Sequence, residues 1–491
     1  MAGEINKIPV GATKFLKPSI EAIESFKEER SCKTSIKTYP IDGSISTIKY
    51  NEETSEFIGK FILEEIPLKK NLFNNMHTSY GVHEEVVLKK NNSDIVVPEN
   101  SVTSMSADLS SPHTVTAHFV HVFQRDESSP DRIYNRLIIE YSQDADELFK
   151  PFSDRQHVEI GSSTYIARLI KFQYNKLEFE MFTSAIKDSE NKRIVIDCLS
   201  EVEWEEFDKI CSAILLTIGF LSGIHIQGEH YYLKSNSTDF NQSLEVRYIK
   251  KDPSTISPLM VVDPSQFVTF CKQRERKELL DTYPAGINNK VLTNFIEIAL
   301  TQPTIARTMK LLIEGNSVKN HILRSGIYSI ALETVTQHIY QENQDRINPI
   351  PDKKLSALIV EELKNIMNQY SKNIPEEGRE ILTKKIENIN SPTNSFKLKK
   401  PFELLRIKLS EKDIKTLNER NSYLHGSSPS ERKGELNHHE DLVTTFHLLT
   451  LIHCLILRYA NYRGHVMNLH TWYLGRSERI DEIDDSIFRI F

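Results

Sequence analysis

The first 200 residues of the chain are a series of short β-branched or aromatic runs separated by polar segments. The runs are STIKYNEETSEFIGKFIL, TVTAHFVHVF, RLIIEYS, STYIARLIKFQY, KLEFEMFTS and KRIVIDCLS. The intervening segments, such as KKNNSD, RDESSPD and KDSENK, carry turn-forming residues. Runs of this length and composition predict antiparallel strands, arranged either as a sandwich or as one curved sheet.

A helix and two more strands are predicted after this region. In EVEWEEFDKICSAILLTIGFLSG, acidic residues crowd the start and Gly223 lies near the end, which fits the polarity of a helix. HYYLKSNSTDFNQSLEVRYIK has the composition of a strand pair, and the Pro- and Ser-rich KKDPSTISPLMVVDPSQ marks a linker. We therefore expect a β-rich N-terminal domain over residues 1–260, with one inserted helix.

Apolar residues recur at helical spacing from about residue 285 onward. The segments that show it are VLTNFIEIALTQ, HILRSGIYSIALETVTQHIYQEN, DKKLSALIVEELKNIMNQY, EEGREILTKKIENIN, KKPFELLRIKLSEKDIKTLNERNSYLH and EDLVTTFHLLTLIHCLILRYANYR. They predict an all-α bundle over residues 285–491. The expected fold class is therefore α+β, a β-rich domain followed by helices. A chain of 491 residues is also too long for one core, so two or three domains are expected.

Composition and charge narrow the classes of function. The formal net charge is −7, so a nucleic-acid site has to be a local basic patch rather than the whole surface. The five cysteines have irregular spacing and no CxxC pair, which is typical of reduced thiols in the cytoplasm. The N-terminus has no apolar run of signal-peptide length, and the longest apolar stretch, residues 211–226, is short for a membrane span. We expect a soluble cytoplasmic protein with no membrane partner.

A polar helix end is predicted in LNERNSYLHGSSPSERK, residues 417–433. Ser410-x-x-Asp413 is a capping pattern that starts or restarts a helix. Gly426 stops the helical spacing, and Pro429 follows three residues later, as is common after a helix. RNSYLH therefore occupies the last turns of this helix.

Three side chains in these turns form the candidate catalytic set, Arg420, Asn421 and His425. Asn421 and His425 are four apart and share a helix face, whereas Arg420 and His425 are about 140° apart with a rise of about 7.5 Å. A long arginine can still bend so that both reach one phosphate. The other arginines that lie five to seven residues upstream of a histidine are Arg432, Arg458 and Arg463, and the residues after them are Lys433, Tyr459 and Gly464, not an asparagine. From spacing alone, a capping histidine and a surface arginine explain the same residues.

An arginine, an adjacent asparagine and a histidine after four intervening positions resemble the signature of the HEPN superfamily. The very apolar helix that follows (residues 442–459) fits this family, and the resemblance covers residues 290–475. A β-rich N-terminal domain joined to such a helical domain, with FDKICSAILLTIGFLSG before EHYYLKS, resembles the ApeA-type abortive-infection proteins. The resemblance implies a metal-independent endoribonuclease, usually dimeric, in which two motif helices meet at a composite cleft. It also implies an antiphage, toxin-like effector whose β-rich domain senses a phage-derived trigger.

The candidate residues suit cleavage of RNA by its own 2′-hydroxyl group. Histidine can take and give protons near neutral pH, and arginine binds two phosphate oxygens with a planar, permanently charged fork. Asn421 can orient His425 or the phosphate without adding charge. We expect an RNA substrate such as tRNA, products with a 2′,3′-cyclic phosphate and a 5′-hydroxyl, and no cofactor or metal. One histidine must act twice, or two chains supply one each, so we expect a homodimer or a higher homo-oligomer.

Other residues are candidates for support or for RNA contact. Glu333 and Tyr423 are candidates for supporting the catalytic set, although Glu333 can equally lie exposed on its helix. Residues 396–433 hold ten Lys or Arg and five Asp or Glu, a local excess of positive charge. This patch can hold a phosphate backbone or be only a solvated helix face. Its candidate RNA contacts are Lys412, Lys415, Arg432 and Lys433.

Other sites and functions have weaker signals. His438 and His439 are adjacent and diverge by about 100° on a helix, and no HExxH or cysteine pair accompanies them, so we expect no zinc site. His447 and His453, in an apolar helix, are expected to be core residues. The alternative function is a non-catalytic RNA- or protein-binding module that uses the same basic helix. A helical domain that only dimerises is a third interpretation.

Overall fold

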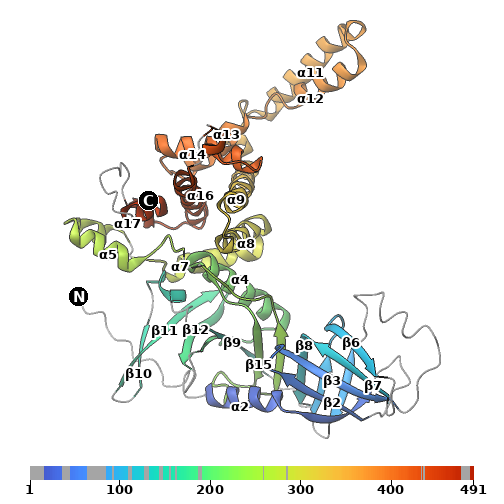
Figure 1. The fold of residues 1–491 in the computed structure, drawn as a ribbon. Helices are drawn as coiled ribbons and strands as arrows, with labels where there is room; N and C mark the ends of the chain where they lie inside the picture. Colours follow the sequence, from blue (N-terminus) through green and yellow to red (C-terminus); the bar gives the residue numbers. More distant parts are fainter. Residues whose placement is uncertain are drawn as a thin grey trace. The chain divides into compact units, whose positions relative to one another are not determined.

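The computed structural model divides into two compact units (Figure 1). Unit 1 comprises Met1–Phe149, Asp154–Gly219 and Ile224–Ile256, and unit 2 comprises Lys150–Ser153, Phe220–Gly223 and Ser257–Phe491. The residues that the structure describes are 16–35, 45–63, 85–90, 93–108, 113–126, 132–142, 147–153, 156–160, 163–185, 191–257, 259–283, 286–432, 434, 437–476 and 487–491.

Unit 1 is built on a 15-stranded sheet in which every pair of neighbouring strands is antiparallel. In spatial order the strands are β10 (Gln156–Ile160), β11 (Ser163–Tyr174), β12 (Leu177–Ala185), β13 (Lys192–Cys198), β9 (Tyr134–Tyr141), β15 (Glu229–Ser235), β16 (Glu245–Lys250), β8 (His121–Asp126), β5 (Ser93–Val97), β4 (Val86–Lys90), β1 (Arg30–Ser35), β2 (Ile45–Asn51), β3 (Glu56–Leu63), β7 (His113–Phe119) and β6 (Val102–Asp108). β14 (Ile224–His225) and β17 (Thr255–Ile256) form a separate pair. The β-rich N-terminal region predicted from the sequence is confirmed.

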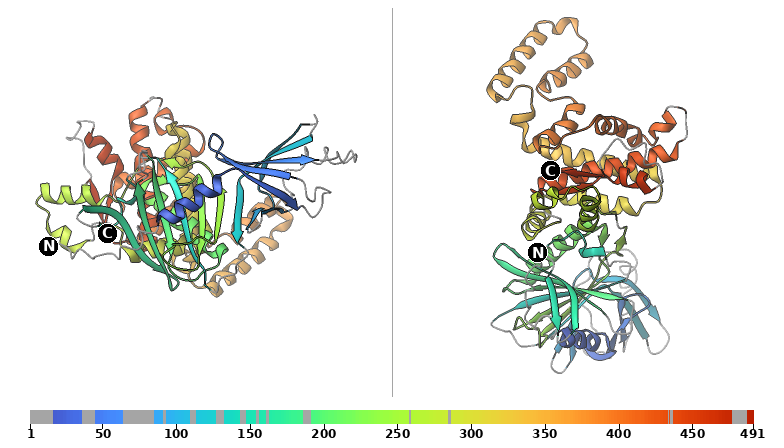
Figure 2. Two further views of the ribbon diagram at one scale, coloured as in Figure 1. Left: turned by 90° about the horizontal axis from the view of Figure 1, so that it is seen from below. Right: turned by 90° about the vertical axis from the view of Figure 1, so that its left-hand side faces the viewer.

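Two helices cover opposite faces of the central strands, α2 (Leu16–Lys27) and the predicted inserted helix α4 (Trp204–Ser222). Figure 2 shows α2 crossing one face of the strands. Tyr231 and Tyr232 are neighbours in β15 and therefore point to opposite faces. Tyr231 packs in the apolar cluster that includes α2, whereas Tyr232 hydrogen-bonds Asp208 of α4. Cover on both faces explains why consecutive residues of β9, β13 and β15 are buried, instead of every second residue.

A buried ion pair fixes α2 against the sheet. Arg136 of β9 donates two hydrogen bonds to Asp197 of β13, at 2.7 Å and 2.8 Å, and both side chains are at most 2% exposed. The same guanidinium donates from Nη1 to Ser19 of α2 at 2.9 Å. Two parallel bonds between an arginine and a carboxylate are strong and directional, so this contact fixes the register of β9 against β13.

The described residues of unit 2 are helical apart from one small pair of strands, so the predicted α+β fold class is confirmed. Its helices are α5 (Pro264–Gln273), α6 (Glu278–Thr282), α7 (Asn289–Thr301), α8 (Pro303–Ser317), α9 (His321–Glu342), α10 (Gln344–Ile347), α11 (Lys353–Gln369), the 3₁₀ turn η2 (Ser371–Asn373), α12 (Glu376–Glu387), α13 (Asn394–Leu404), α14 (Glu411–Leu424), α15 (Pro429–Arg432), α16 (His438–Tyr459) and α17 (Leu469–Arg476). The strand pair is β18 (His465–Met467) with β19 (Phe488–Ile490). The helices begin at Pro264, inside the expected linker and before residue 285, because Asp263 caps α5 there.

The core of unit 2 is formed around α16, which packs against α9, α14 and α17. His447 and His453 of α16 are 3% and 1% exposed, so their predicted core positions are confirmed. Among the described residues, α16 alone is long and apolar enough to cross a membrane, and 72% of its most apolar window is buried inside the protein. That burial is the environment of a core helix, whose hydrophobicity is satisfied by protein contacts.

Candidate active site

The helix that carries RNSYLH, α14, begins at a complete capping box. The hydroxyl of Ser410 accepts a hydrogen bond from the amide of Asp413 at 3.1 Å, and the Asp413 carboxylate accepts one from the amide of Ser410 at 2.8 Å. α13 ends at Leu404, so a new helix starts at the predicted restart. This start determines which residues fall in the last turn of α14.

Two polar residues at the end of α14, Asn421 and His425, face solvent. The helix ends at Leu424, and His425 is its C-terminal cap residue. Gly426 follows with φ +74°, a conformation that glycine adopts most readily, and its amide donates to the carbonyl of Tyr423 at 3.1 Å. The side chains of Asn421 and His425 are both exposed, so this end of the helix is accessible.

Arg420 points into the protein, although it lies next to Asn421 in sequence. It is 6% exposed, and its Nη1 donates to the carbonyl of Leu417 at 3.0 Å. Its Nη2 donates to Glu333 of α9, also at 3.0 Å, and the Glu333 side chain is 46% exposed. Nε is buried with no hydrogen-bond partner among the described residues. Glu333 therefore contacts the candidate set through Arg420.

The structure brings Arg420 together with Glu333, and it does not join Arg420 to the other two candidate residues. No hydrogen bond in the described part of the chain links Arg420, Asn421 and His425 to one another. Arg420 faces α9, whereas Asn421 and His425 face solvent. A phosphate bound at His425 reaches Arg420 only if the guanidinium turns away from Glu333.

The remaining candidate residues have separate surroundings. Tyr423 is 3% exposed and donates to the backbone carbonyl of Asp441 at 3.4 Å, and its pKa is raised by burial, with further effect from the Asp441 charge. Lys412 and Lys415 are exposed on α14. Arg432 is exposed and donates to Ser427 at 3.2 Å. Lys433 lies outside the described residues. Tyr423 is thus a packing residue of α14, while Lys412, Lys415 and Arg432 remain accessible to a polyanion.

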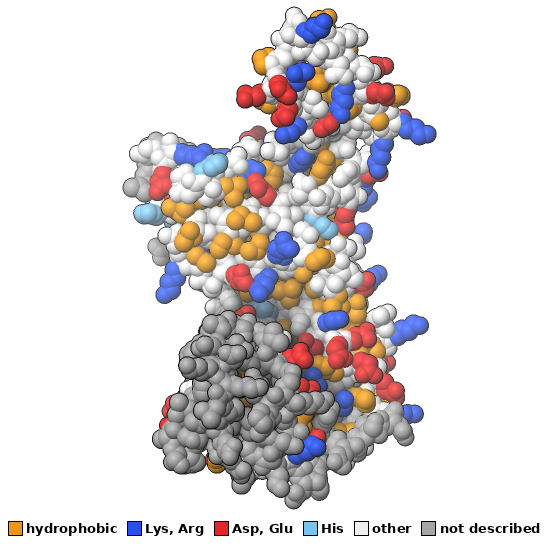
Figure 3. All heavy atoms as spheres, turned by 90° about the vertical axis from the view of Figure 1, so that its right-hand side faces the viewer, with side chains coloured by type: hydrophobic (Ala, Val, Ile, Leu, Met, Phe, Trp, Pro, Cys, Tyr) orange, Lys and Arg blue, Asp and Glu red, His pale blue; other side chains and the backbone are white. Residues whose placement is uncertain are grey.

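An apolar strip of α9 leads to Glu333. Leu323 and Ile330 are 63% and 49% exposed, and they lie seven residues apart on one helix face. Ile327 lies between them and is half-buried. Figure 3 shows hydrophobic side chains gathered on unit 2 at the height of α8 and α9. The ion pair of Arg420 with Glu333 therefore lies at one end of an apolar surface, which we call the α9 strip (Leu323, Ile327 and Ile330).

A buried polar network holds the start of α14. Asp413 has a fully buried side chain and accepts from Arg489 of β19, at 2.9 Å from Nη1 and 2.6 Å from Nη2. Its Oδ1 also bonds Nε2 of His447 at 2.5 Å, and Nδ1 of His447 bonds Thr416 at 3.0 Å. Burial raises the pKa of Asp413, but the hydrogen bonds from His447 and Arg489 outweigh it and hold that pKa below its usual value.

The sequence indicated two members of this network singly. Asp413 was expected in the capping box and His447 in the core, and both positions are confirmed. Arg489 was not singled out, because it lies 76 residues from Asp413 and belongs to a strand of three residues. Nothing in the local pattern indicates that a charged side chain near residue 490 enters the helical core.

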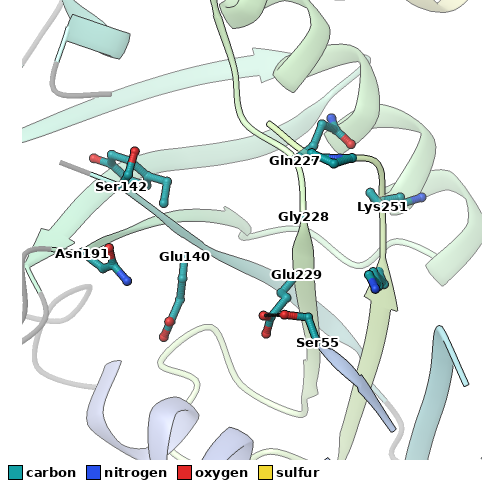
Figure 4. Close-up of a pocket in the computed structure, with 11 residues that line it drawn as sticks. Ser55, Glu140, Ser142, Asn191, Gln227, Gly228, Glu229 and Lys251 are labelled. Atoms are coloured by element: carbon teal, nitrogen blue, oxygen red, sulfur yellow. Dashed lines mark hydrogen bonds between the residues drawn. The ribbon is translucent and has the colours of Figure 1, made fainter. Parts of the chain in front are cut away.

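Unit 1 contains a cavity of about 370 Å³ that is lined mainly by residues with polar side chains (Figure 4). Figure 4 shows Glu140 and Asn191 on one side of it and Glu229, Ser55 and Lys251 on the other. Glu229 accepts from Ser55 at 2.6 Å and from Tyr231 at 2.6 Å. Burial raises the pKa of Glu229, and these hydrogen bonds more than offset that effect, so the pKa is lower than usual. The carboxylates that line the cavity are therefore held by protein partners.

Comparison with other proteins identified no relative of the chain. None of the protein families, curated proteins or solved structures compared with the chain matches it. Within the described residues, no three His, Cys, Asp or Glu side chains lie close enough together to hold a metal ion. The motif, its helical context and the geometry of α14 and α9 are therefore the features that indicate a function.

Proposed function

We propose that the chain is a metal-independent endoribonuclease of the HEPN type that cuts RNA, with tRNA as one substrate class, in antiphage abortive-infection defence. The observation that carries the proposal is the exposed pair Asn421 and His425 at the capped end of α14, with Arg420 beside them in sequence. A solvent-exposed imidazole is accessible to a polymer as large as RNA, and a buried one is not. The defence role comes from the resemblance in motif and architecture.

In this proposal the three side chains have distinct roles. His425 takes the proton of the 2′-hydroxyl or gives one to the departing 5′-oxygen, and Asn421 orients the imidazole or the phosphate. Arg420 binds the non-bridging phosphate oxygens after its Nη2 leaves Glu333. Glu333 is half-exposed, so water can solvate its carboxylate when the arginine leaves. The bond that forms joins the 2′-oxygen to phosphorus, and the bond to the 5′-oxygen breaks.

A second copy of the chain supplies what one copy lacks. Each chain brings one His425, while base and acid act at the same time on opposite sides of the phosphate. The α9 strip is exposed and adjoins the pair of Arg420 with Glu333, so packing of two strips brings two ends of α14 near each other. A homodimer with two facing motifs is therefore part of the proposal, and unit 1 acts as the part that senses a phage-derived trigger.

One observation favours the alternative, a non-catalytic RNA- or protein-binding module. Arg420 is buried and its charge is neutralised by Glu333 in the single chain. In that function the exposed Lys412, Lys415 and Arg432 hold the phosphate backbone, and the identity of residue 425 has no effect beyond its charge.

The test is cleavage of RNA in EDTA by the wild type and by His425→Gln, His425→Ala and Arg420→Ala, with analysis of the product ends. We expect a cyclic phosphate end from the wild type and a loss of rate of about 10²- to 10⁴-fold in both His425 variants. His438→Ala is the matched control, because His438 is also exposed but begins a different helix. Because His425 is exposed, its replacement opens no cavity, and unchanged circular dichroism checks the fold.

Three results separate the proposal from its rivals. Full activity of the His425 variants would show that His425 is not part of the catalytic site. Loss of wild-type activity in EDTA would contradict a mechanism without metal. Tight RNA binding without cleavage by any variant, with affinity that follows charge alone, supports the binding module instead.

A further inference from the structure

The segment between α10 and α13 is a helical hairpin made of α11, η2 and α12, which we call the 350–390 hairpin. Its base is closed by two hydrogen bonds, from the Ile350 amide to the Asn390 side chain at 2.7 Å and from the Asn390 side chain to the Ile350 carbonyl at 2.9 Å. α11 and α12 pack against each other, and Thr383 contacts the sulfur of Met367 at 3.7 Å. The helices are therefore antiparallel within one chain.

The hairpin has no buried residue in either helix. Its inner seam is only half-buried, and a second set of large apolar side chains faces outward. These are Leu355, Leu358, Ile366, Tyr370, Ile381, Leu382 and Ile389, which are 38% to 61% exposed. On α11, Leu355, Leu358 and Ile366 recur at spacings of three and eight, which places them along one face.

A hairpin of this kind does not supply its own stability. Helices of 17 and 12 residues are marginal in isolation, and two of them without a buried core leave most of their apolar surface in water. A contiguous set of exposed apolar side chains on such an element marks an interaction surface. Figure 3 shows hydrophobic, acidic and basic side chains intermixed at the height of α11 and α12 in Figure 1.

The charges of the two helices identify the partner. α11 begins with Lys353 and Lys354, and α12 begins with Glu376 and Glu377, each 23 positions later. The same spacing relates Glu361 and Glu362 of α11 to Lys384 and Lys385 of α12, and it relates Lys364 to Glu387. When α11 and α12 are aligned parallel and level, every one of these charges lies at the same height as an opposite charge on the other helix.

One chain cannot make this alignment, because its own helices run in opposite directions. Lys364 does reach Glu387 at 2.6 Å within the hairpin, near the closed base of α12. Lys353 and Glu376, in contrast, lie at opposite ends of the hairpin, since each begins its helix. An α12 that is parallel to α11 comes only from another chain.

We propose that the 350–390 hairpin binds the same hairpin of a second copy, and that the two form an antiparallel four-helix bundle with their turns at opposite ends. A two-fold axis perpendicular to the helices makes each α11 parallel to α12 of the second copy. Lys353 and Lys354 then face Glu376 and Glu377, and the outward apolar residues become the core of the bundle. This interface is separate from the α9 strip and does not depend on the proposed ribonuclease activity.

The test reverses the charges at one end of each helix in the full-length chain. One variant is Lys353→Glu with Lys354→Glu, and the other is Glu376→Lys with Glu377→Lys. All four side chains are exposed in the single chain, so neither change disturbs a core. In each variant the contact between copies becomes repulsive at both ends of the bundle, and the dissociation constant at low salt rises by about tenfold or more.

Mixing the two variants distinguishes direct contact from general damage. A mixed pair restores opposite charges at both ends, so sedimentation equilibrium of the mixture shows association near that of the wild type. The matched control for the lysine variant is Lys290→Glu with Lys310→Glu, which makes the same change of net charge on exposed residues outside the hairpin, and it leaves association unchanged. In 1 M salt the difference between the variants and the wild type shrinks.

A second experiment addresses the apolar part of the interface. Leu358→Gln with Ile381→Gln removes two outward apolar side chains, which are 58% and 56% exposed, and lowers the assembled mass by half. If chains also pair through the α9 strip, the wild type is a tetramer and the variant a dimer. If they do not, the wild type is a dimer and the variant a monomer. Either result supports the bundle. An unchanged mass in these variants, or a mixture that associates no better than either charge variant alone, overturns it. A wild-type chain that sediments as a monomer at high concentration does the same, and a different protein partner for the hairpin then becomes the explanation.

Discussion

The guanidinium of Arg420 and the carboxylate of Glu333 are joined by a 3.0 Å hydrogen bond between residues that lie 87 positions apart. The two ends of this bond differ in exposure, because the arginine side chain is 7% exposed and the glutamate side chain 46%. A half-exposed ion pair contributes at most about 1 kcal/mol, so a phosphate can displace the carboxylate. In the proposed function, Glu333 therefore competes with the RNA phosphate for the guanidinium of Arg420.

Replacement of Glu333 by Gln should strengthen RNA binding. The amide oxygen can still accept from Nη2 of Arg420, while the charge that neutralises the guanidinium is gone. We expect RNA affinity to rise several-fold and the slope of log affinity against log salt to steepen by about one unit. RNA binding by the His425→Ala chain, for which the proposed function predicts no cleavage, checks this when it is measured over a range of salt concentrations.

The matched control is Glu314→Gln. Glu314 also pairs with a basic side chain, Lys310, at 3.8 Å, but both are exposed on α8. The control should leave the salt slope unchanged. Weaker binding by Glu333→Gln would mean that the charge of Glu333 is needed to hold Arg420 in its functional position.

Breaking the pair between Asp413 and Arg489 should destabilise unit 2 by about 3–5 kcal/mol, because it leaves a buried charge without its partner. Arg489→Gln is the informative change, since Asp413 is fully buried and keeps only its bonds to His447 and Ser410. Urea unfolding at neutral pH measures the loss. Asp352→Asn, at the exposed cap of α11, is the control and should cost under about 0.5 kcal/mol. A similar small loss for Arg489→Gln would show that water enters and solvates Asp413.

The network around Asp413 should lose its contribution to stability in acid. The pKa of Asp413 is lower in the folded chain than its usual value, because hydrogen bonds from His447 and Arg489 outweigh burial. As the pH falls, the Asp413 carboxylate is therefore protonated in the unfolded chain before it is protonated in the folded chain. The stability that Asp413 contributes is complete above about pH 3.9 and is lost below it. Asp413→Asn should remove this part of the pH dependence at pH 2–4, measured as the slope of unfolding free energy against pH.

Local patterns predicted the parts of the fold that depend on neighbouring residues. The capping box of Ser410 and Asp413, the stop at Gly426 and the alternation of runs and turns in unit 1 all depend on contacts within a few residues. Spacing also predicted that Asn421 and His425 share a face. It could not predict which face of α14 turns inward, because that depends on α9, and so the burial of Arg420 was not foreseen.

Long-range contacts between polar residues could not be predicted from the sequence. Arg489 enters the core only because β19 pairs with β18, and neither strand is longer than three residues. The contact of Glu333 with Arg420 was one of two interpretations of a charged residue in an apolar helix. Helical periodicity leaves such choices open, since it reports an apolar face and not the partner that covers it.

The five cysteines should resist thiol reagents in the folded chain. None of the five forms a disulfide and all are buried, and burial raises the pKa of Cys198 to about 11 and that of Cys454 to about 12. The thiolate is the reactive form, so both access and ionisation are suppressed. We expect less than one thiol per chain to react within minutes at neutral pH, and five in urea. Lys372→Cys adds an exposed thiol that should react at once; rapid reaction of the native five would contradict their burial.

Mild acid should destabilise unit 2 through His453. Its ring is 1% exposed, Nδ1 lies 2.9 Å from the carbonyl of Leu449, and the ring stacks on Phe220 with centroids 4.6 Å apart. Burial lowers the pKa of His453 to about 4, and the hydrogen bonds to the backbone only partly offset this. The folded chain therefore stays neutral at this ring while the unfolded chain becomes protonated below about pH 6.5.

The sign of the effect follows from where the proton binds. Between about pH 6.5 and pH 4 the unfolded state binds one more proton at His453, so unfolding becomes easier as the pH falls, by up to about 1.4 kcal/mol per pH unit. Over this range the loss is about 3 kcal/mol. His453→Phe keeps a ring on Phe220 and should abolish this share of the acid sensitivity, measured by urea unfolding at pH 7, 6, 5 and 4.5. His438→Phe, on the exposed start of α16, controls for the substitution, and equal slopes for the two variants would place the acid sensitivity elsewhere.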